Sequence, residues 1–258
     1  RSLDMAEVTG SSPVPPTSFD TVRRGDQVKA DEDVGTEHLD LGEVLEAPAR
    51  GSADELLDAG AGDHLSRMRH SAAHVMAEAV MRLFPGVQLG IGPAIADGFY
   101  YDFLVERPLT PDDLAAIESE MAKSIRANHT FLLAEYSFEE ARAALVRFGQ
   151  PFKVEIMDDL ASAAERSGAP APRVTTYQHG EFQDLCRGPH VESTGKIGPF
   201  KLLSVAGAYW RGKSDRPMLQ RIYGTAWETQ EQLDQYLWRR DEARKRDHRK
   251  LGVALDLF

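Results

Sequence analysis

The sequence predicts an α+β fold in which helices pack against a mostly antiparallel sheet. Stretches with apolar residues every three or four positions, typical of amphipathic helices, interleave with short apolar and aromatic stretches, typical of strands. Their order lacks the regular strand–helix–strand rhythm of a parallel sheet. We expect this fold to be preceded by a poorly structured N-terminal segment and followed by a long charged helix. With 258 residues, the chain can form one large or two modest domains.

Residues 1–63 have the composition of a tail or linker, including the proline- and serine-rich stretch 11–16. They carry 15 acidic and 5 basic side chains, so almost all of the chain's net charge of −11 lies there. Residues 211–250 instead carry 11 basic and 7 acidic side chains. We therefore expect a phosphate-bearing partner to meet the C-terminal part.

Composition also excludes several classes of protein. The single cysteine excludes an internal disulfide and fits a reducing compartment. The sequence has no apolar run of membrane-spanning length and no apolar signal region at its N-terminus. We therefore predict a cytoplasmic protein without a membrane partner.

The first predicted helix begins near Asp63 and ends before Pro85. His70 and His74 lie off its apolar stripe, one turn apart, as groups that line a cleft would. The stripe itself consists of Leu65, Met68, Ala72, Val75, Met76, Ala79, Val80 and Leu83.

Two strands are predicted next, over Val87–Ile95 and Phe99–Phe103, joined by a hairpin turn. A helix then begins after Thr110, which is a good N-cap, and continues through Ile125.

The middle of the chain predicts a strand over Thr130–Tyr136 and a short helix that begins with a capping box at Ser137. A further strand over Pro151–Met157 would contain Lys153, and a helical turn and loop would follow over Asp158–Pro172.

The last part predicts strands over Arg173–Tyr177, Phe200–Leu203 and Leu219–Tyr223. The segment Thr225-Ala226-Trp227-Glu228 matches a capping box, so the long charged helix is expected to begin there and to end near Lys250.

Two pairs of potential ligands share one spacing. His70 and His74 are four residues apart on a helix, while Cys186 and His190 flank a Gly-Pro turn, with Asp184 just before them. One pocket built from these pairs can hold Zn²⁺ tetrahedrally, or it can orient water and substrate without a metal. The sequence lacks the glutamate that HExxH hydrolases place beside their first histidine.

Lys153 has two interpretations. In the middle of a strand it either extends into solvent at a sheet edge, which its residue type alone favours, or points into a polar pocket as a donor. Consecutive tyrosines at 100 and 101 would place one ring on each face of a strand, one in the core and one with its hydroxyl toward a cleft. The mixture of aromatic residues and arginines around Arg211 and Arg221 suits contact with nucleic-acid bases and phosphates, although a plain aromatic core with a charged rim is the default.

Seven segments together closely resemble bacterial threonyl-tRNA synthetases, in family order over residues 64–258. They are His70-Ser-Ala-Ala-His74, Ile91-Gly-Pro93, Asp97-Gly-Phe-Tyr-Tyr-Asp102, Asp184-Leu-Cys-Arg-Gly-Pro-His190, Ala208-Tyr-Trp-Arg-Gly212, Leu219-Gln-Arg-Ile-Tyr-Gly-Thr-Ala-Trp227 and Lys245-Arg-Asp-His-Arg-Lys-Leu-Gly252.

The resemblance implies three regions. Residues 64–224 resemble the family's editing domain, and residues 225–258 the linker helix that leads to a class II catalytic core, which the sequence given does not contain. Residues 1–63 are then a tail or a degenerate ubiquitin-like module. The implied activity is hydrolysis of Ser-tRNA(Thr), with tRNA(Thr) as partner. ATP, magnesium and a homodimer are expected only for the full-length synthetase, and no aminoacylation is expected from this part alone.

The resemblance also implies residue roles. His70 and Lys153 would position or activate water, and Asp184 would bind the seryl ammonium. Tyr101, His74, Cys186 and His190 would shape the pocket, without a metal. The residues expected to contact tRNA are Arg211, Arg221, Arg239, Arg240, Arg244 and Lys245.

Two other functions remain open. A zinc-dependent, alanyl-type deacylase would use His70, His74, Cys186 and His190 as ligands. A tRNA-docking module without activity would use only the basic C-terminal helix.

Overall fold

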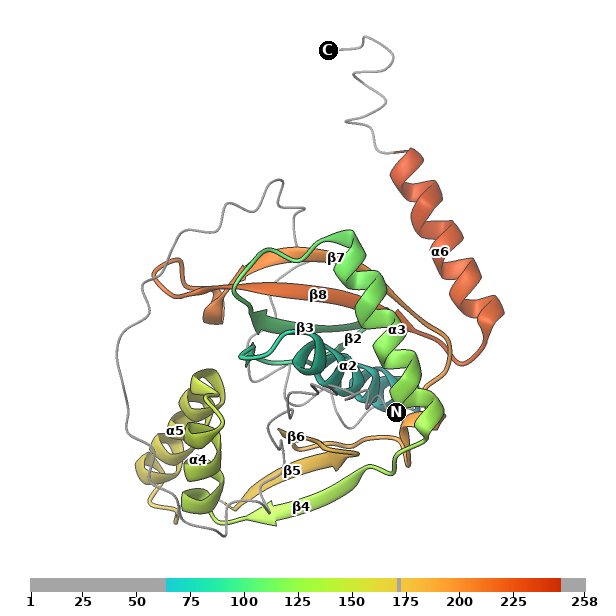
Figure 1. The fold of residues 1–258 in the computed structure, drawn as a ribbon. Helices are drawn as coiled ribbons and strands as arrows, with labels where there is room; N and C mark the ends of the chain where they lie inside the picture. Colours follow the sequence, from blue (N-terminus) through green and yellow to red (C-terminus); the bar gives the residue numbers. More distant parts are fainter. Residues whose placement is uncertain (1–63, 171–172, 247–258) are drawn as a thin grey trace, which may run out of the picture.

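The computed structural model describes residues 64–170 and 173–246. It contains two antiparallel sheets, with helix α2 beside the larger one (Figure 1). The α+β prediction is confirmed: these ranges hold five α-helices, and every strand pairing in them is antiparallel. The predictions for residues 1–63 lie outside the described ranges. In chain order the elements are α2 (His64–Leu83), β1 (Gln88–Leu89), β2 (Ala94–Ile95), β3 (Gly98–Leu104), α3 (Pro111–Ala127), β4 (Leu132–Tyr136), α4 (Phe138–Arg147), α5 (Pro151–Arg166), β5 (Val174–His179), β6 (Phe182–Leu185), η3 (Thr194–Lys196), β7 (Phe200–Tyr209), η4 (Trp210–Gly212), β8 (Met218–Ala226) and α6 (Gln230–Lys245).

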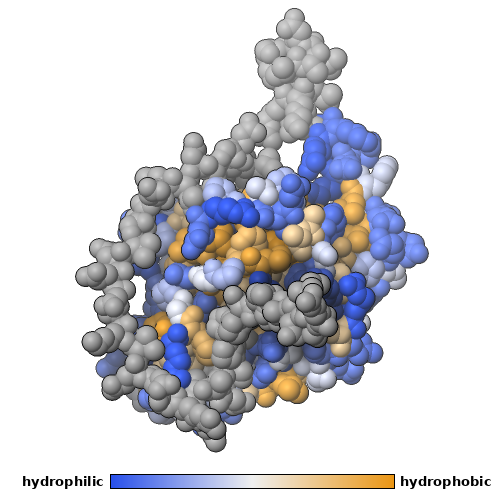
Figure 2. Space-filling view, viewed as in Figure 1, coloured by the Kyte–Doolittle hydropathy of each residue, from blue (hydrophilic) through white to orange (hydrophobic). Residues whose placement is uncertain are grey.

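The large sheet has the order β1-β3-β8-β7, with β2 paired to β3, and the small sheet has the order β4-β5-β6. Nearly all of α2 between Met68 and Val80 is buried, because the helix packs against the large sheet, α3 and the small sheet's Phe182. Apolar residues gather across the middle of the molecule over the large sheet, with polar residues around them (Figure 2). Helices α4 and α5 form a separate apolar cluster with β5 of the small sheet. None of the helices in the described ranges has the length and apolarity that a membrane span requires.

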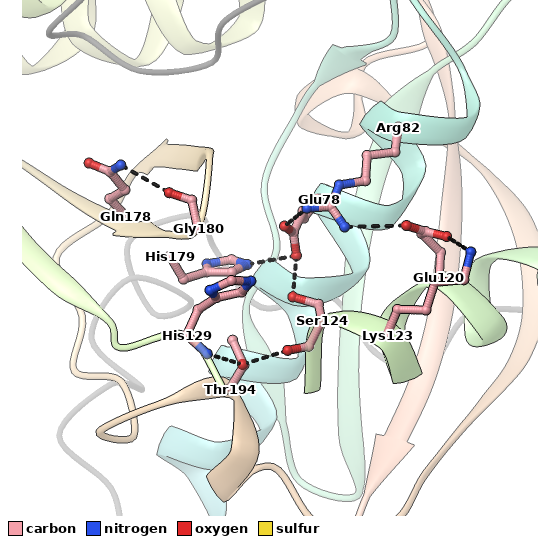
Figure 3. Close-up of polar contacts among 10 residues, drawn as sticks. All are labelled: Glu78, Arg82, Glu120, Lys123, Ser124, His129, Gln178, His179, Gly180 and Thr194. Atoms are coloured by element: carbon pink, nitrogen blue, oxygen red, sulfur yellow. Dashed lines mark hydrogen bonds and ion pairs between the residues drawn. The ribbon is translucent and has the colours of Figure 1, made fainter. Parts of the chain in front are cut away.

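A buried polar network fixes α2 to its neighbours (Figure 3). The Glu78 carboxylate accepts hydrogen bonds from Ser124 Oγ of α3 at 2.5 Å, from His179 Nε2 of β5 at 3.1 Å and from Arg82 at 2.6 Å. Buried polar groups need such partners, because an unpaired one costs the full free energy of desolvation. The network therefore holds the helix that carries His70 and His74 against α3 and the small sheet.

The predicted starts of α3 and α4 are confirmed. Thr110 and Ser137 each form a full capping box, with Asp113 and Glu140 as their partners. Both signals are local in the sequence, so no tertiary contact is needed to place them.

The strand predicted over Pro151–Met157 is wrong, because this segment is the start of α5. Apolar and polar residues alternate there, but Phe152 and Ile156 are also one helical turn apart and pack in the same apolar cluster with Trp210 of η4, directly after β7. Proline is compatible with the first turn of a helix because its missing N–H would have no intrahelical partner.

The helix start predicted at Thr225 is also wrong. Strand β8 continues to Ala226, and the Thr225 hydroxyl donates to the Asp97 carbonyl oxygen at 2.6 Å. Thr229 is the N-cap of α6, in a capping box with Gln232. The end predicted near Lys250 lies outside the described residues.

Smaller differences concern the strands. The single strand expected over Val87–Ile95 is two short strands, β1 and β2, and β6 was not predicted. Strands β7 and β8 are both longer than expected, and they form a continuous pair with a bulge between Leu202 and Ser204.

Candidate functional site

Helix α2 supplies the first two side chains of the candidate site. His70 is partly exposed, and its Nδ1 lies 3.3 Å from the Pro189 carbonyl oxygen. His74 is 2% exposed, and within the described residues its Nδ1 has no hydrogen-bond partner. The two rings are 5.0 Å apart. The helical spacing thus brings both imidazoles to one place, as predicted.

The loop that follows β6 supplies the next two. Cys186 Sγ lies 3.4 Å from both His70 Nε2 and His190 Nε2. Gly188 shapes this loop: its φ is +69°, and any Cβ would lie 2.5 Å from the Tyr177 hydroxyl. The four residues of the two predicted pairs therefore share one pocket, which we call the histidine–cysteine cluster (His70, His74, Cys186 and His190).

A buried ion pair lies beside this cluster. Lys153 Nζ is 2.7 Å from Asp184 Oδ1 and 2.9 Å from the Tyr101 hydroxyl oxygen, and Tyr101 donates to Asp184 Oδ2 at 2.5 Å. All three residues are buried. The interpretation of Lys153 as a solvated residue at a sheet edge is therefore wrong. We call these three residues the lysine triad.

Three separate elements converge in the lysine triad. Tyr101 comes from β3 of the large sheet, Asp184 from β6 of the small sheet, and Lys153 from the first turn of α5. That turn is held beside the large sheet, because the side-chain amide of Gln150 hydrogen-bonds the backbone of Val87 and Leu89 and Phe152 packs 4.9 Å from the ring of Trp210, which follows β7.

Burial makes the histidine–cysteine cluster electrically neutral. It lowers the pKa of His70, and together with the neighbouring histidines it lowers the pKa values of His74 and His190 well below the usual range. Burial also raises the pKa of the Cys186 thiol to about 12. The cluster at neutral pH is thus three uncharged imidazoles and an uncharged thiol.

The same four residues fit a zinc ion. Their ligand atoms all lie within 4.8 Å of one another, and the unpartnered Nδ1 of buried His74 is the kind of atom that a metal would satisfy. Three histidines and one cysteine are also a ligand set that tetrahedral zinc accepts.

The residues predicted to contact tRNA are not gathered in one place. Arg221 forms a bidentate pair with Asp102, at 2.7 and 2.9 Å, and lies over the Tyr100 ring. Arg211 binds Glu155 at 3.1 Å. The other four lie on α6, at Arg239, Arg240, Arg244 and Lys245.

Sequence reasoning missed three residues that shape the pocket. Ser71 hydrogen-bonds His190 Nδ1 at 3.0 Å, and Tyr177 packs 4.5 Å from the His190 ring. Gly92 lies against Tyr101, so that a Cβ at this position would be 2.0 Å from the ring. Ser71 and Gly92 fall inside segments that were singled out, but only the fold shows what they touch.

Comparison with known proteins supports the resemblance seen in the sequence. Residues 174–223 match the family described as the threonyl and alanyl tRNA synthetase second additional domain. The chain is 57% identical over 194 residues to the threonine–tRNA ligase of Solidesulfovibrio magneticus, and the matched region covers 75% of this chain and 29% of that protein. It is 50% identical over 196 residues to that of Myxococcus xanthus, and 46% identical over 225 residues to that of Wolbachia pipientis.

The match to the Myxococcus protein covers 76% of this chain and 30% of that protein. The match to the Wolbachia protein covers 87% of this chain and 34% of that protein. The chain therefore spans about a third of the length of these relatives. Residues 174–223 thus match the threonyl and alanyl tRNA synthetase second additional domain, and three quarters or more of the chain is similar to one part of the bacterial threonine–tRNA ligases.

Proposed function

We propose that this chain hydrolyses the ester that joins serine to the terminal adenosine of tRNA(Thr), as the editing part of a threonyl-tRNA synthetase. The observation that carries the proposal is the buried ammonium of Lys153, held by Asp184 and Tyr101 beside a neutral histidine–cysteine cluster. Within this proposal, residues 64–224 are the editing domain, and residues 225–258, which include helix α6, are the linker to the catalytic core. Full-length relatives would use ATP and magnesium for aminoacylation. We expect a homodimer only for the full-length synthetase.

The chemical need for such a site follows from the similarity of the two amino acids. Threonine and serine differ by one methyl group, which a binding pocket can distinguish by only about 1–3 kcal/mol. A second pocket that excludes the larger amino acid can hydrolyse the wrong product selectively. The aminoacyl ester is already activated, so a positioned water and a few polar groups suffice.

We assign activation of the attacking water to His70. Its Nδ1–H donates to the Pro189 carbonyl, so its Nε2 carries a lone pair that faces the pocket. Nε2 takes a proton from water as the water oxygen bonds to the ester carbonyl carbon. The bond from that carbon to the adenosine oxygen then breaks, and this oxygen receives the proton.

Lys153 supplies positive charge for the same reaction. Its ammonium donates to Asp184 and Tyr101 in the structure, and one of these hydrogens would turn to the oxyanion that develops on the ester carbonyl. Asp184 would bind the seryl ammonium, in which case the substrate shares a carboxylate that already accepts hydrogen bonds from Lys153 and Tyr101. His74, Cys186 and His190, with Tyr101, would form the walls.

A zinc-dependent deacylase is the second candidate, because the histidine–cysteine cluster fits a zinc ion. His70, His74, Cys186 and His190 would hold it, and a bound zinc would supply Lewis-acid activation of water or of the ester carbonyl. In that case Lys153 and Tyr101 would still bind and orient the substrate.

For RNA contact we propose the basic residues of α6. Arg239 and Arg244 are exposed there. Arg211 and Arg221 were expected to contribute, but both bind carboxylates of the protein itself, so RNA contact would require them to exchange partners.

The test is deacylation of Ser-tRNA(Thr) by the whole chain, with Thr-tRNA(Thr) as the matched control substrate. Hydrolysis of the seryl ester alone, before and after exhaustive chelation, supports the metal-free proposal. Activity that disappears on chelation and returns with stoichiometric zinc favours the second candidate. Binding of tRNA(Thr) without hydrolysis of either ester would leave a docking module and refute both.

A further inference from the structure

Ser71 lies between the two histidines of α2 in sequence, yet it contacts a different part of the site. Its side chain is fully buried. The hydroxyl oxygen is 2.9 Å from the Arg67 carbonyl oxygen, 3.1 Å from the Val191 backbone nitrogen and 3.0 Å from His190 Nδ1. One hydroxyl group thus makes three hydrogen bonds.

The direction of each bond follows from the chemistry of its partner. A carbonyl oxygen only accepts, so the single hydroxyl hydrogen goes to Arg67. The Val191 N–H only donates, so it occupies one of the two lone pairs on Oγ. The other lone pair accepts from His190, and the proton of that imidazole is therefore on Nδ1.

His190 Nε2 must then carry a lone pair, and it faces the pocket 3.4 Å from Cys186 Sγ. His70 reaches the same state through a different partner, since its Nδ1–H donates to the Pro189 carbonyl and its Nε2 also lies 3.4 Å from Sγ. One thiol hydrogen can satisfy only one of these two acceptors. When the thiol hydrogen turns away from both rings, the pocket presents paired acceptors to whatever enters it.

We propose that Ser71 is a positioning residue that fixes His190 as a hydrogen-bond acceptor, so that His70 and His190 together hold the attacking water by its two hydrogens. This inference rests on the proposed hydrolysis and adds a second imidazole to the water site. A water bound in this way has its remaining lone pairs free for the ester carbonyl carbon.

The experiment uses the metal-free whole chain labelled with ¹⁵N-histidine. In the wild type, the ring-nitrogen shifts of His190 should show a protonated Nδ1 and an unprotonated Nε2. If Nε2 of His190 carries the proton instead, the proposal is wrong. This measurement needs no substitution and no activity.

Ser71→Ala removes the acceptor for Nδ1–H, so the proton is free to occupy Nε2. In the folded variant the ring-nitrogen shifts should change to the other tautomer. The kcat for Ser-tRNA(Thr) should fall by at least about tenfold with KM within about twofold, since a wrong tautomer disables an imidazole as acceptor. Ser71→Thr keeps a hydroxyl and should restore both the tautomer and most of kcat.

Ser124→Ala is the matched control, because Ser124 is another buried helical serine whose hydroxyl donates, here to Glu78, away from the cluster. It should lower stability without changing the His190 shifts or kcat. An unchanged tautomer in Ser71→Ala, or equal losses of kcat in both variants, would overturn the proposal. If the wild type hydrolyses neither ester, the proposed function fails, and the His190 shifts still decide whether Ser71 sets the tautomer.

Discussion

Replacing Lys153 by methionine separates two roles of the lysine triad, its contribution to stability and its contribution to hydrolysis. Methionine keeps an unbranched stem and removes only the ammonium, which lies 2.7 and 3.0 Å from the Asp184 oxygens. Lys153 and Asp184 are 3% and 4% exposed, so the variant leaves a buried carboxylate with one remaining partner, the Tyr101 hydroxyl. Breaking a buried pair in this way typically lowers the free energy of unfolding by about 3–5 kcal/mol.

The effect on the reaction is independent of that loss. If the ammonium stabilises the developing oxyanion, its removal should slow deacylation by about 10²–10³-fold, which corresponds to roughly 2.7–4 kcal/mol. Urea denaturation measures the stability of Lys153→Met, and single-turnover hydrolysis of Ser-tRNA(Thr) measures its rate at a temperature where it is folded. Binding of tRNA(Thr) should be unchanged.

The double variant Lys153→Met/Asp184→Asn tests the reasoning. Asparagine still accepts the Tyr101 hydrogen bond but carries no charge, so most of the lost stability should return while hydrolysis stays slow. Wild-type turnover by folded Lys153→Met would remove Lys153 from the mechanism. A double variant no more stable than the single one would show that the uncompensated carboxylate is not the source of the stability loss.

Three further predictions concern other parts of the chain. Gly92→Ala should slow hydrolysis at least about tenfold, because the new Cβ forces the Tyr101 ring away from Asp184; an unchanged rate in a folded variant would contradict this. The affinity for tRNA(Thr) should fall steeply between about 50 and 200 mM salt, whereas removal of the acidic residues 1–63 should barely weaken it in a binding titration. Burial opposes a low pKa for Glu78, but hydrogen bonds from His179 and Ser124 and the Arg82 charge outweigh it and lower the pKa. The stability that Glu78 contributes is present above its unfolded pKa, near 4.5, and is lost as pH falls through the folded pKa, so Glu78→Gln should lose less stability than wild type in urea titrations from about pH 5 to 3.

Elements fixed by interactions between residues close in sequence were predictable, whereas elements fixed by contacts between distant residues were not. The helix starts at Thr110, as an N-cap, and at Ser137, as a capping box, were predicted correctly because four consecutive residues contain the whole signal. Thr225 shows the same pattern in sequence, but a hydrogen bond to Asp97 in a distant turn keeps it in β8. The start of α5 was mistaken for a strand because its apolar residues fit both periodicities over a few residues.

The histidine–cysteine cluster was predictable as two matched pairs, and the structure brings all four residues together. The lysine triad was not predictable from spacing, because Tyr101 and Asp184 are 83 residues apart and lie in different sheets. The resemblance to threonyl-tRNA synthetases pointed to its members. Ser71 has no signal beyond its position between two histidines, since two of the three partners of its hydroxyl, His190 and Val191, come from the loop after β6.

The origin of the lysine triad in three separate elements also bears on how the protein folds. The contact between Cys186 and His70 closes a loop of 116 residues, and that between Asp184 and Tyr101 closes a loop of 83 residues. Such long loops are expected to form late in folding, because the chain loses conformational entropy on closure before the new contacts stabilise it. During synthesis, the pocket around His70 cannot form until the loop after β6 has left the ribosome. Hydrolytic activity should therefore be among the last properties to appear on refolding, and a sensitive measure of whether the two sheets have docked.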